Sequence, residues 1–192
     1  GVDDESLKAM DELVSEGITS FKLFMAYPGV FYSDDGQILR AMQQAKHNGS
    51  MIMMHAENGI AIDVLVAQAL ARGETAPINH GLTRPWETEQ EATHRAIMLA
   101  RITGAPLYIV HMSAKQAVQT LREARDLGLN VFGETCPQYL FLTAADLGID
   151  DSYQGARCIC SPPPRDKANQ RFIWNALSSG LFTIVSSDHA PF

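Results

Sequence analysis

Several features are missing from this sequence, and each absence excludes a class of protein. The 192 residues contain no apolar run of about 18 residues, the length needed to cross a membrane. Basic residues number 15 against 22 acidic ones, the net charge is -7, and no basic cluster indicates a nucleic-acid partner. No secretory signal pattern opens the chain. A composition that is 46% hydrophobic and 19% charged is typical of a globular protein with a substantial core.

Cysteine is also scarce. The three cysteines are Cys136, Cys158 and Cys160, and no C-x-x-C pair occurs among them. An odd number of cysteines without such a pair argues against a disulfide framework and against a thiolate zinc site. Free thiols in a reducing compartment are expected instead, which favours a cytoplasmic location.

Glycine-rich phosphate-binding loops are missing as well, because neither G-x-G-x-x-G nor G-x-x-x-x-G-K-[ST] follows any apolar run. What is present is an alternation of short apolar strands with amphipathic helices, which predicts parallel strands and right-handed crossovers. The two candidate folds are an open doubly wound sheet and a piece of a (β/α) barrel. Strands are expected from Ser20 to a turn at Pro28-Gly29 and near 51–54, 107–110, 129–135 and 181–187, with helices over 4–16, between Asp34 and Gly49, and over 60–72, 87–103, 114–127 and 167–179.

The expected strands and one of the helices carry specific burial predictions. Each strand is a short continuous apolar run, which is typical of a strand buried on both faces. The helix over 60–72 is apolar almost all round, so it too is expected to be well buried.

A single lysine, Lys22, interrupts the apolar run of the first strand. Burying a bare ammonium group costs several kcal/mol, on the order of 3–5, unless the group is paired or neutralised. Two interpretations stay open at this point. Lys22 is either a salt-bridged or snorkelling lysine, or a lysine whose amine is kept neutral for chemistry.

Candidate metal ligands lie within or just after four of the expected strands. Lys22 lies in the first strand, His55 and His111 follow the second and third, and Asp188 follows the last. Parallel strands present their carboxyl ends on one face, where active sites are built. Each residue alone is more typical of a hydrogen-bonded histidine or a capping aspartate. Together their nitrogen and oxygen donors favour a site for Zn²⁺ or a similar divalent ion.

The chain resembles a central to C-terminal segment of the cyclic amidohydrolases of the dihydropyrimidinase and D-hydantoinase family. The matching stretches occur in family order and cover nearly the whole chain. They are Ser20-Phe21-Lys22 through Ala26-Tyr27, His55-Ala56-Glu57-Asn58, Val110-His111-Met112-Ser113, Glu134 through Leu140, Cys160-Ser161-Pro162-Pro163, and Ser186 through Phe192.

This resemblance implies an α/β fold, an incomplete TIM-type (β/α) barrel of the metal-dependent hydrolase kind. About five parallel strands would correspond to family strands four to eight, in a single partial catalytic domain, 1–192, truncated at both ends. A closed barrel typically needs about 250 residues.

The resemblance also implies roles for individual residues. Lys22 would be carbamylated by CO₂ and would bridge two divalent metal ions, expected to be Zn²⁺, while His55 and His111 would bind the second metal. Asp188 would bind the first metal and act as general acid and base. Tyr27 would donate its hydroxyl to the oxyanion, and the backbone of Ser161 would contact the cyclic amide.

The family's first metal site also requires a His-x-His pair, and the six histidines of this chain include none. The strand that carries the pair would precede residue 1, and a downstream substrate-contacting asparagine would follow residue 192. The isolated chain is therefore expected to be inactive and to self-associate through its unpaired strand edges.

The activity that the resemblance implies is hydrolytic opening of a small cyclic amide, a dihydropyrimidine or a 5-substituted hydantoin. A homo-oligomer is expected, since the family usually forms homotetramers. An allantoinase-like or dihydroorotase-like hydrolase stays open as an alternative. So does a non-catalytic, dihydropyrimidinase-like scaffold protein, although such relatives typically lose metal ligands that are present here.

Overall fold

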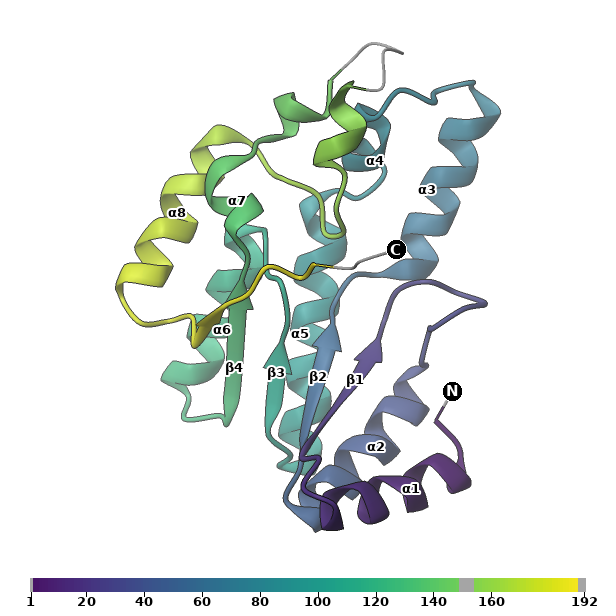
Figure 1. Cartoon of the computed structure of the whole chain (residues 1–192), viewed down its shortest axis with the longest axis vertical. Helices are drawn as coiled ribbons and strands as arrows, with labels where there is room; N and C mark the ends of the chain where they lie inside the picture. The colour runs from purple at the N-terminus through teal and green to yellow at the C-terminus, as the bar shows by residue number, and fades with distance from the viewer. Residues whose placement is uncertain (1, 149–153, 190–192) are drawn as a thin grey trace.

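Five parallel strands form one sheet, and their order across the sheet is their order along the chain (Figure 1). The computed structural model describes residues 2–148 and 154–189. A doubly wound sheet reverses its strand order at a switch point, whereas a barrel does not. The order therefore confirms the partial-barrel prediction. The strands are β1 (Ser20–Phe24), β2 (Met51–His55), β3 (Leu107–Ile109), β4 (Val131–Thr135) and β5 (Ile184–Val185).

Helices connect successive strands, and side-chain caps fix the starts of several of them. Asp3, Asp34, Asn58 and Asp166 each accept a hydrogen bond from a backbone N–H in the first turn of the helix that follows. The helices are α1 (Asp4–Ser15), α2 (Asp35–Asn48), α3 (Gly59–Ala71), α4 (Ile78–Leu82), α5 (Trp86–Thr103), α6 (Lys115–Asp126), α7 (Pro137–Phe141) and α8 (Lys167–Ser178), with 3-10 turns η1 (Ala144–Leu147) and η2 (Gln154–Cys158). None of the described helices has the length and apolarity to span a bilayer.

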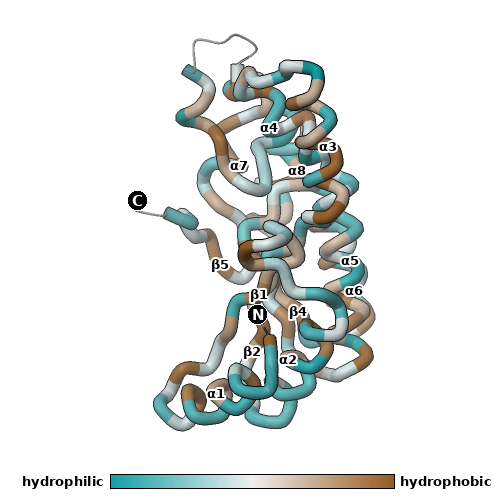
Figure 2. The backbone as a smooth tube through the Cα atoms, turned by 90° about the vertical axis from the view of Figure 1, so that its right-hand side faces the viewer, coloured by the Kyte–Doolittle hydropathy of each residue, from teal (hydrophilic) through white to brown (hydrophobic). Residues whose placement is uncertain are grey.

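The two faces of the sheet have different surroundings. Figure 2 shows α5 and α6 on one side of the sheet, while the segment that follows β5 extends on the other side. The side chains that face the helices are fully buried, and they include Ile52, Met54, Leu107, Ile109 and Val131. The alternate residues occupy matching register positions on the opposite face, which in a closed barrel is the interior. They include Lys22, Met53, Tyr108 and Phe132.

The prediction that the first strand is buried on both faces is wrong for β1, and the Lys22 side chain on it is exposed. β1 is an edge strand of the described sheet, and its exposed and half-buried residues show that no second layer covers it. The Lys22 ammonium lies 5.0 Å from the centroid of the Phe24 ring, on the open face. Solvent and this cation–π contact accommodate the charge, so the desolvation cost that the sequence suggested does not arise.

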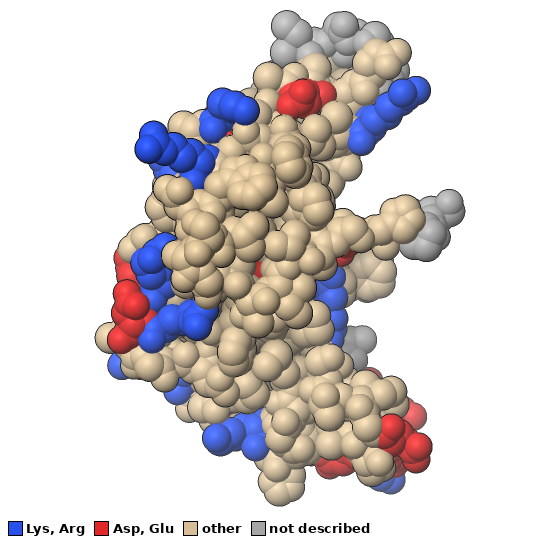
Figure 3. Space-filling model, turned by 60° about the vertical axis from the view of Figure 1, so that its left-hand side comes forward, with Lys and Arg blue, Asp and Glu red and all other residues tan. Residues whose placement is uncertain are grey.

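Two further burial predictions are also wrong. Along α3, Ile60, Val64 and Leu70 are more than half exposed, because only one side of this apolar helix packs against the protein. The last strand is shorter than predicted: only Ile184 and Val185 pair with β4, and both are exposed. Figure 3 shows the segment after β5 projecting from the body of the molecule.

Candidate metal centre

Two histidines from neighbouring strands meet at the carboxyl end of the sheet, as the sequence predicts. His55 is the last residue of β2, and His111 follows β3. Both are buried, and their rings lie edge to face with centroids 4.5 Å apart. Burial holds the pKa of His111 well below its usual value, and the charges of His55 and Lys22 lower it further. Lys22 is therefore close enough to act electrostatically on His111.

The hydrogen bonding of the two rings fits a metal ligand. Nδ1 of His111 is buried and has no hydrogen-bond partner, while Nε2 of His55 lies 2.8 Å from Oε2 of Glu57. A buried polar atom left without a partner costs about 1–3 kcal/mol, a cost that is removed when the atom coordinates an ion. Neutral imidazole nitrogen is among the preferred zinc ligands. The pair therefore supplies donors of the right type for a divalent ion.

Asp188 does not join this pair as a third close ligand. It is exposed, in the segment after β5. Within residues 2–148 and 154–189, no three His, Cys, Asp or Glu side chains gather closely enough to hold an ion. The Asp188 carboxylate still contributes to raising the pKa values of Tyr27 and Cys160, so it faces the same region. The last three residues of the matching stretch, 190–192, lie outside the described residues.

Tyr27 and Ser161, the two predicted substrate contacts, are brought together. The Ser161 side chain lies close enough to the Tyr27 hydroxyl to lower its pKa, against the larger effect of burial. The Tyr27 ring centroid is 5.2 Å from that of His55. Burial raises the pKa of Tyr27, and the carboxylates of Glu57 and Asp188 raise it further. The hydroxyl therefore keeps its proton at neutral pH and can donate a hydrogen bond.

His80 and Arg84 also belong to this region, although the sequence favours a structural or interface role in a loop. The loop expected over 73–85 instead contains the short helix α4. His80 Nε2 lies 2.9 Å from the carbonyl oxygen of Cys160 and 3.2 Å from Oγ of Ser161. Because a carbonyl only accepts, Nε2 carries the proton. Arg84 donates from Nη1 to the His80 carbonyl at 3.2 Å, so both residues support the segment that carries Ser161.

Backbone strain is concentrated at predicted site residues. Among the described residues, the non-glycine residues with positive φ are Tyr27 at 60°, His111 at 41° and Asp188 at 49°. Each such conformation costs on the order of 1–3 kcal/mol and persists only where the surroundings impose it. Strained residues of this kind cluster at functional sites. No sequence pattern indicated this strain, yet three of the six site residues predicted from the sequence have it.

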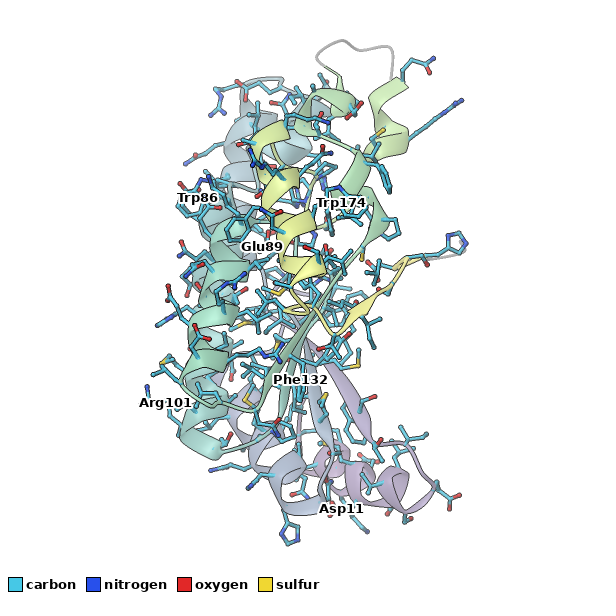
Figure 4. All side chains as sticks on the ribbon, turned by 90° about the vertical axis from the view of Figure 1, so that its left-hand side faces the viewer. Asp11, Trp86, Glu89, Arg101, Phe132 and Trp174 are labelled. Carbon is cyan, nitrogen blue, oxygen red and sulfur yellow. The ribbon has the colours of Figure 1, made fainter. Side chains whose placement is uncertain are left out.

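A buried ion pair connects the loop that follows His111 to the segment that follows Ser161. Glu89, labelled in Figure 4, accepts hydrogen bonds from the backbone N–H of Ser113 at 2.8 Å and that of Ala114 at 3.0 Å. Arg165 donates to Glu89 at 2.8 Å and to the Ser113 hydroxyl at 3.0 Å. Every charge in this network is paired, so it can hold both segments in place.

Known proteins resemble this chain over its whole length. No protein-family model matches it. The D-hydantoinase of Streptomyces coelicolor is 63% identical over 191 residues, which cover 100% of this chain and 41% of that protein. The D-hydantoinase of Geobacillus stearothermophilus is 48% identical over 192 residues, again 100% of this chain and 41% of the relative.

Solved structures give the same result. The crystal structure of dihydropyrimidinase from Brevibacillus agri matches with a TM-score of 0.96 at 47% identity, covering 99% of this chain and 41% of that one. The structure of D-hydantoinase from a Bacillus sp. has the same TM-score, 0.96, at 47% identity and the same coverage. This chain spans about two fifths of the length of these relatives, and over that part it is similar to D-hydantoinases and dihydropyrimidinases.

Proposed function

We propose that the whole protein is a metal-dependent hydrolase that opens the ring of a cyclic amide, either a dihydropyrimidine or a 5-substituted hydantoin. The observation that carries this proposal is the contact between His55 and His111, whose ring centroids are 4.5 Å apart at two neighbouring strand ends. Identity of 63% to a D-hydantoinase over the whole chain supports the substrate class.

His55 and His111 would hold one divalent ion, which we propose is zinc. Lys22, carbamylated by CO₂, would become an oxygen donor able to bridge that ion to a second one, to which Asp188 would also bind. The exposed position of Lys22 leaves its amine accessible to CO₂. When bound, the ions would lower the pKa of a water molecule toward neutrality and polarise the substrate carbonyl.

The remaining steps fall to side chains of this chain. Asp188 would take a proton from the water molecule that adds to the carbonyl carbon, and would return it to the ring nitrogen as the carbon–nitrogen bond breaks. Tyr27, protonated at neutral pH, would donate its hydroxyl to the oxygen anion that forms on the carbonyl. The backbone of Ser161, supported by His80, would contact the amide of the ring.

Metal analysis and a ring-opening assay on the whole protein test the proposal. Bound divalent metal and turnover of dihydrouracil or a 5-substituted hydantoin are expected, with loss of turnover after chelation. A protein that binds no metal and opens neither ring would contradict it. Turnover of allantoin or dihydroorotate alone would instead identify an allantoinase-like or dihydroorotase-like hydrolase. We expect this chain by itself to show no turnover.

A further inference from the structure

The buried contact between His55 and Glu57 has no assigned role in the chemistry above. Oε2 of Glu57 lies 2.8 Å from Nε2 of His55, and the two residues are only 1% and 2% exposed. We propose that Glu57 is a positioning residue that holds the His55 ring in one tautomer, with the proton on Nε2 and the lone pair on Nδ1. The consequence for metal binding rests on the proposed function; the tautomer itself does not.

Hydrogen-bond chemistry determines the tautomer. An ionised carboxylate can only accept, so the ring nitrogen that faces it must carry the proton. The other nitrogen of a neutral imidazole is then a lone-pair donor. Metal-binding histidines generally donate their second N–H to a carboxylate or a carbonyl, which sets the ring orientation and raises the basicity of the ligand. Glu57 is placed to accept such a hydrogen bond from His55.

Two hydrogen bonds hold the backbone that follows Glu57, which helps to fix the position of the carboxylate. The backbone N–H of Asn58 donates to the Thr88 carbonyl at 3.0 Å, and that of Gly59 donates to the Met25 carbonyl at 3.0 Å. A Cβ at Gly59 would lie 2.7 Å from the Cα of Ala26, so only glycine permits this approach. Glu57 therefore sits in a short, rigid link between β2 and α3.

Within the described part of the chain, the surroundings of Glu57 supply no permanently charged cation as a partner for its carboxylate. No Lys or Arg pairs with it among the described residues, and its Oε1 is buried without a hydrogen-bond partner. A buried carboxylate with so few partners is costly for the fold. Its negative charge also helps to raise the pKa of Tyr27, so it lies close to the proposed oxyanion donor. A purely structural residue at this position would be better replaced by an apolar one.

The test compares the wild-type chain with Glu57→Gln and Glu57→Ala. Glu74→Gln is the matched control, because Glu74 is a surface carboxylate paired with Arg72. Nitrogen-15 NMR of the imidazole rings, on metal-free protein near neutral pH, identifies the protonated nitrogen of His55. Titration with Co²⁺ then measures metal affinity. Circular dichroism confirms that each variant is folded.

We expect the wild type and Glu74→Gln to show His55 protonated on Nε2 alone. Glu57→Ala should show a mixture of tautomers and a Co²⁺ affinity about 10- to 100-fold weaker. Glu57→Gln keeps an acceptor for the Nε2 proton, so it should retain the tautomer and lose less affinity. A wild type with the proton on Nδ1 overturns the proposal, and so does a folded Glu57→Ala that keeps both tautomer and affinity.

If Glu57→Ala fails to fold, the His55 tautomers of the wild type and of Glu57→Gln test the proposal. Retention of the Nε2 tautomer in both supports the proposal, and its loss in Glu57→Gln or its absence from the wild type overturns it. Because the tautomer is read without metal or substrate, it can fail while the proposed hydrolase activity stands. Conversely, a whole protein without ring-opening activity leaves the tautomer result intact.

Discussion

The imidazole rings of His55 and His111 lie edge to face with their centroids 4.5 Å apart, although they belong to different strands. Two carboxylates fix the positions of these histidines, one through a ring nitrogen and the other through a backbone N–H. Glu57 contacts the ring of His55 at 2.8 Å, and Glu134 accepts from the backbone N–H of His111 at 3.3 Å. Glu134 also accepts from the Ser186 hydroxyl at 3.0 Å, so it connects His111 to the segment that carries Asp188.

The ion pair between Arg165 and Glu89 is expected to dominate local stability. Its side chains are 9% and 3% exposed, and replacing Arg165 by Ala leaves a buried carboxylate without its cation. We expect Arg165→Ala to lower the free energy of unfolding by about 3–5 kcal/mol in urea titrations. Arg72→Ala breaks an exposed pair with Glu74 and should cost less than about 1 kcal/mol. Equal losses in the two variants would contradict this ranking.

The stability of the folded chain is expected to depend on pH through His80. Burial, together with the charge of Arg84, holds its pKa below the usual value of 6.5. In the unfolded chain His80 takes up a proton as the pH falls through its ordinary pKa, while in the folded protein it stays neutral. Its contribution to stability is therefore present above about pH 6.5 and is lost as the pH falls below that value.

The variant His80→Gln measures this contribution, because an amide can donate to the Cys160 carbonyl and does not titrate. The difference in the free energy of unfolding between wild type and His80→Gln should shrink or change sign from pH 7 to pH 5. His94→Gln, at an exposed position, serves as the control and should show no such trend. A difference independent of pH would count against a neutral, buried His80.

Lys22 should matter for chemistry and little for folding. Because its side chain is exposed, Lys22→Ala is expected to change the free energy of unfolding by no more than about 0.5 kcal/mol, as should Lys8→Ala on α1. In the whole protein, Lys22→Ala should abolish ring opening and lower the metal content, while Lys8→Ala should leave both unchanged. Full activity of Lys22→Ala would exclude the bridging role.

The open edges of the sheet are expected to make this chain self-associate. Among the described strands, β1 and β5 each have one unpaired side, and exposed apolar residues lie beside them: Val30, Phe31, Ile184 and Val185. Unpaired edges with apolar surroundings are templates for association with another chain. Light scattering should show a concentration-dependent increase in mass, whereas a monodisperse monomer at all concentrations would contradict this prediction.

Much of the fold could be predicted from local patterns in the sequence. Helix starts coincide with capping residues such as Asp34 and Asp166, and apolar periodicity identifies the alternation of strands and helices. The meeting of His55 and His111 was also predictable, since parallel strands present their carboxyl ends together. These features depend on near neighbours in the chain, which is why a single sequence reveals them.

Features that depend on distant neighbours could not be predicted in this way. The exposure of Lys22 and of the apolar helix α3 depends on what covers each element. The role of Arg165 depends on Glu89, which precedes it by several elements of structure. The positive φ angles of Tyr27 and His111 depend on the packing around each strand end, because positive φ is uncommon for any residue other than glycine.

The central claim is that His55 and His111 together hold a divalent metal ion. Titration of the whole protein with Zn²⁺ or Co²⁺, compared with its variants His55→Ala and His111→Ala and the exposed control His94→Ala, tests it most directly. We predict metal binding by the wild type and by His94→Ala, and greatly weakened binding by either of the other two variants. Equal binding by all four folded proteins would contradict the claim.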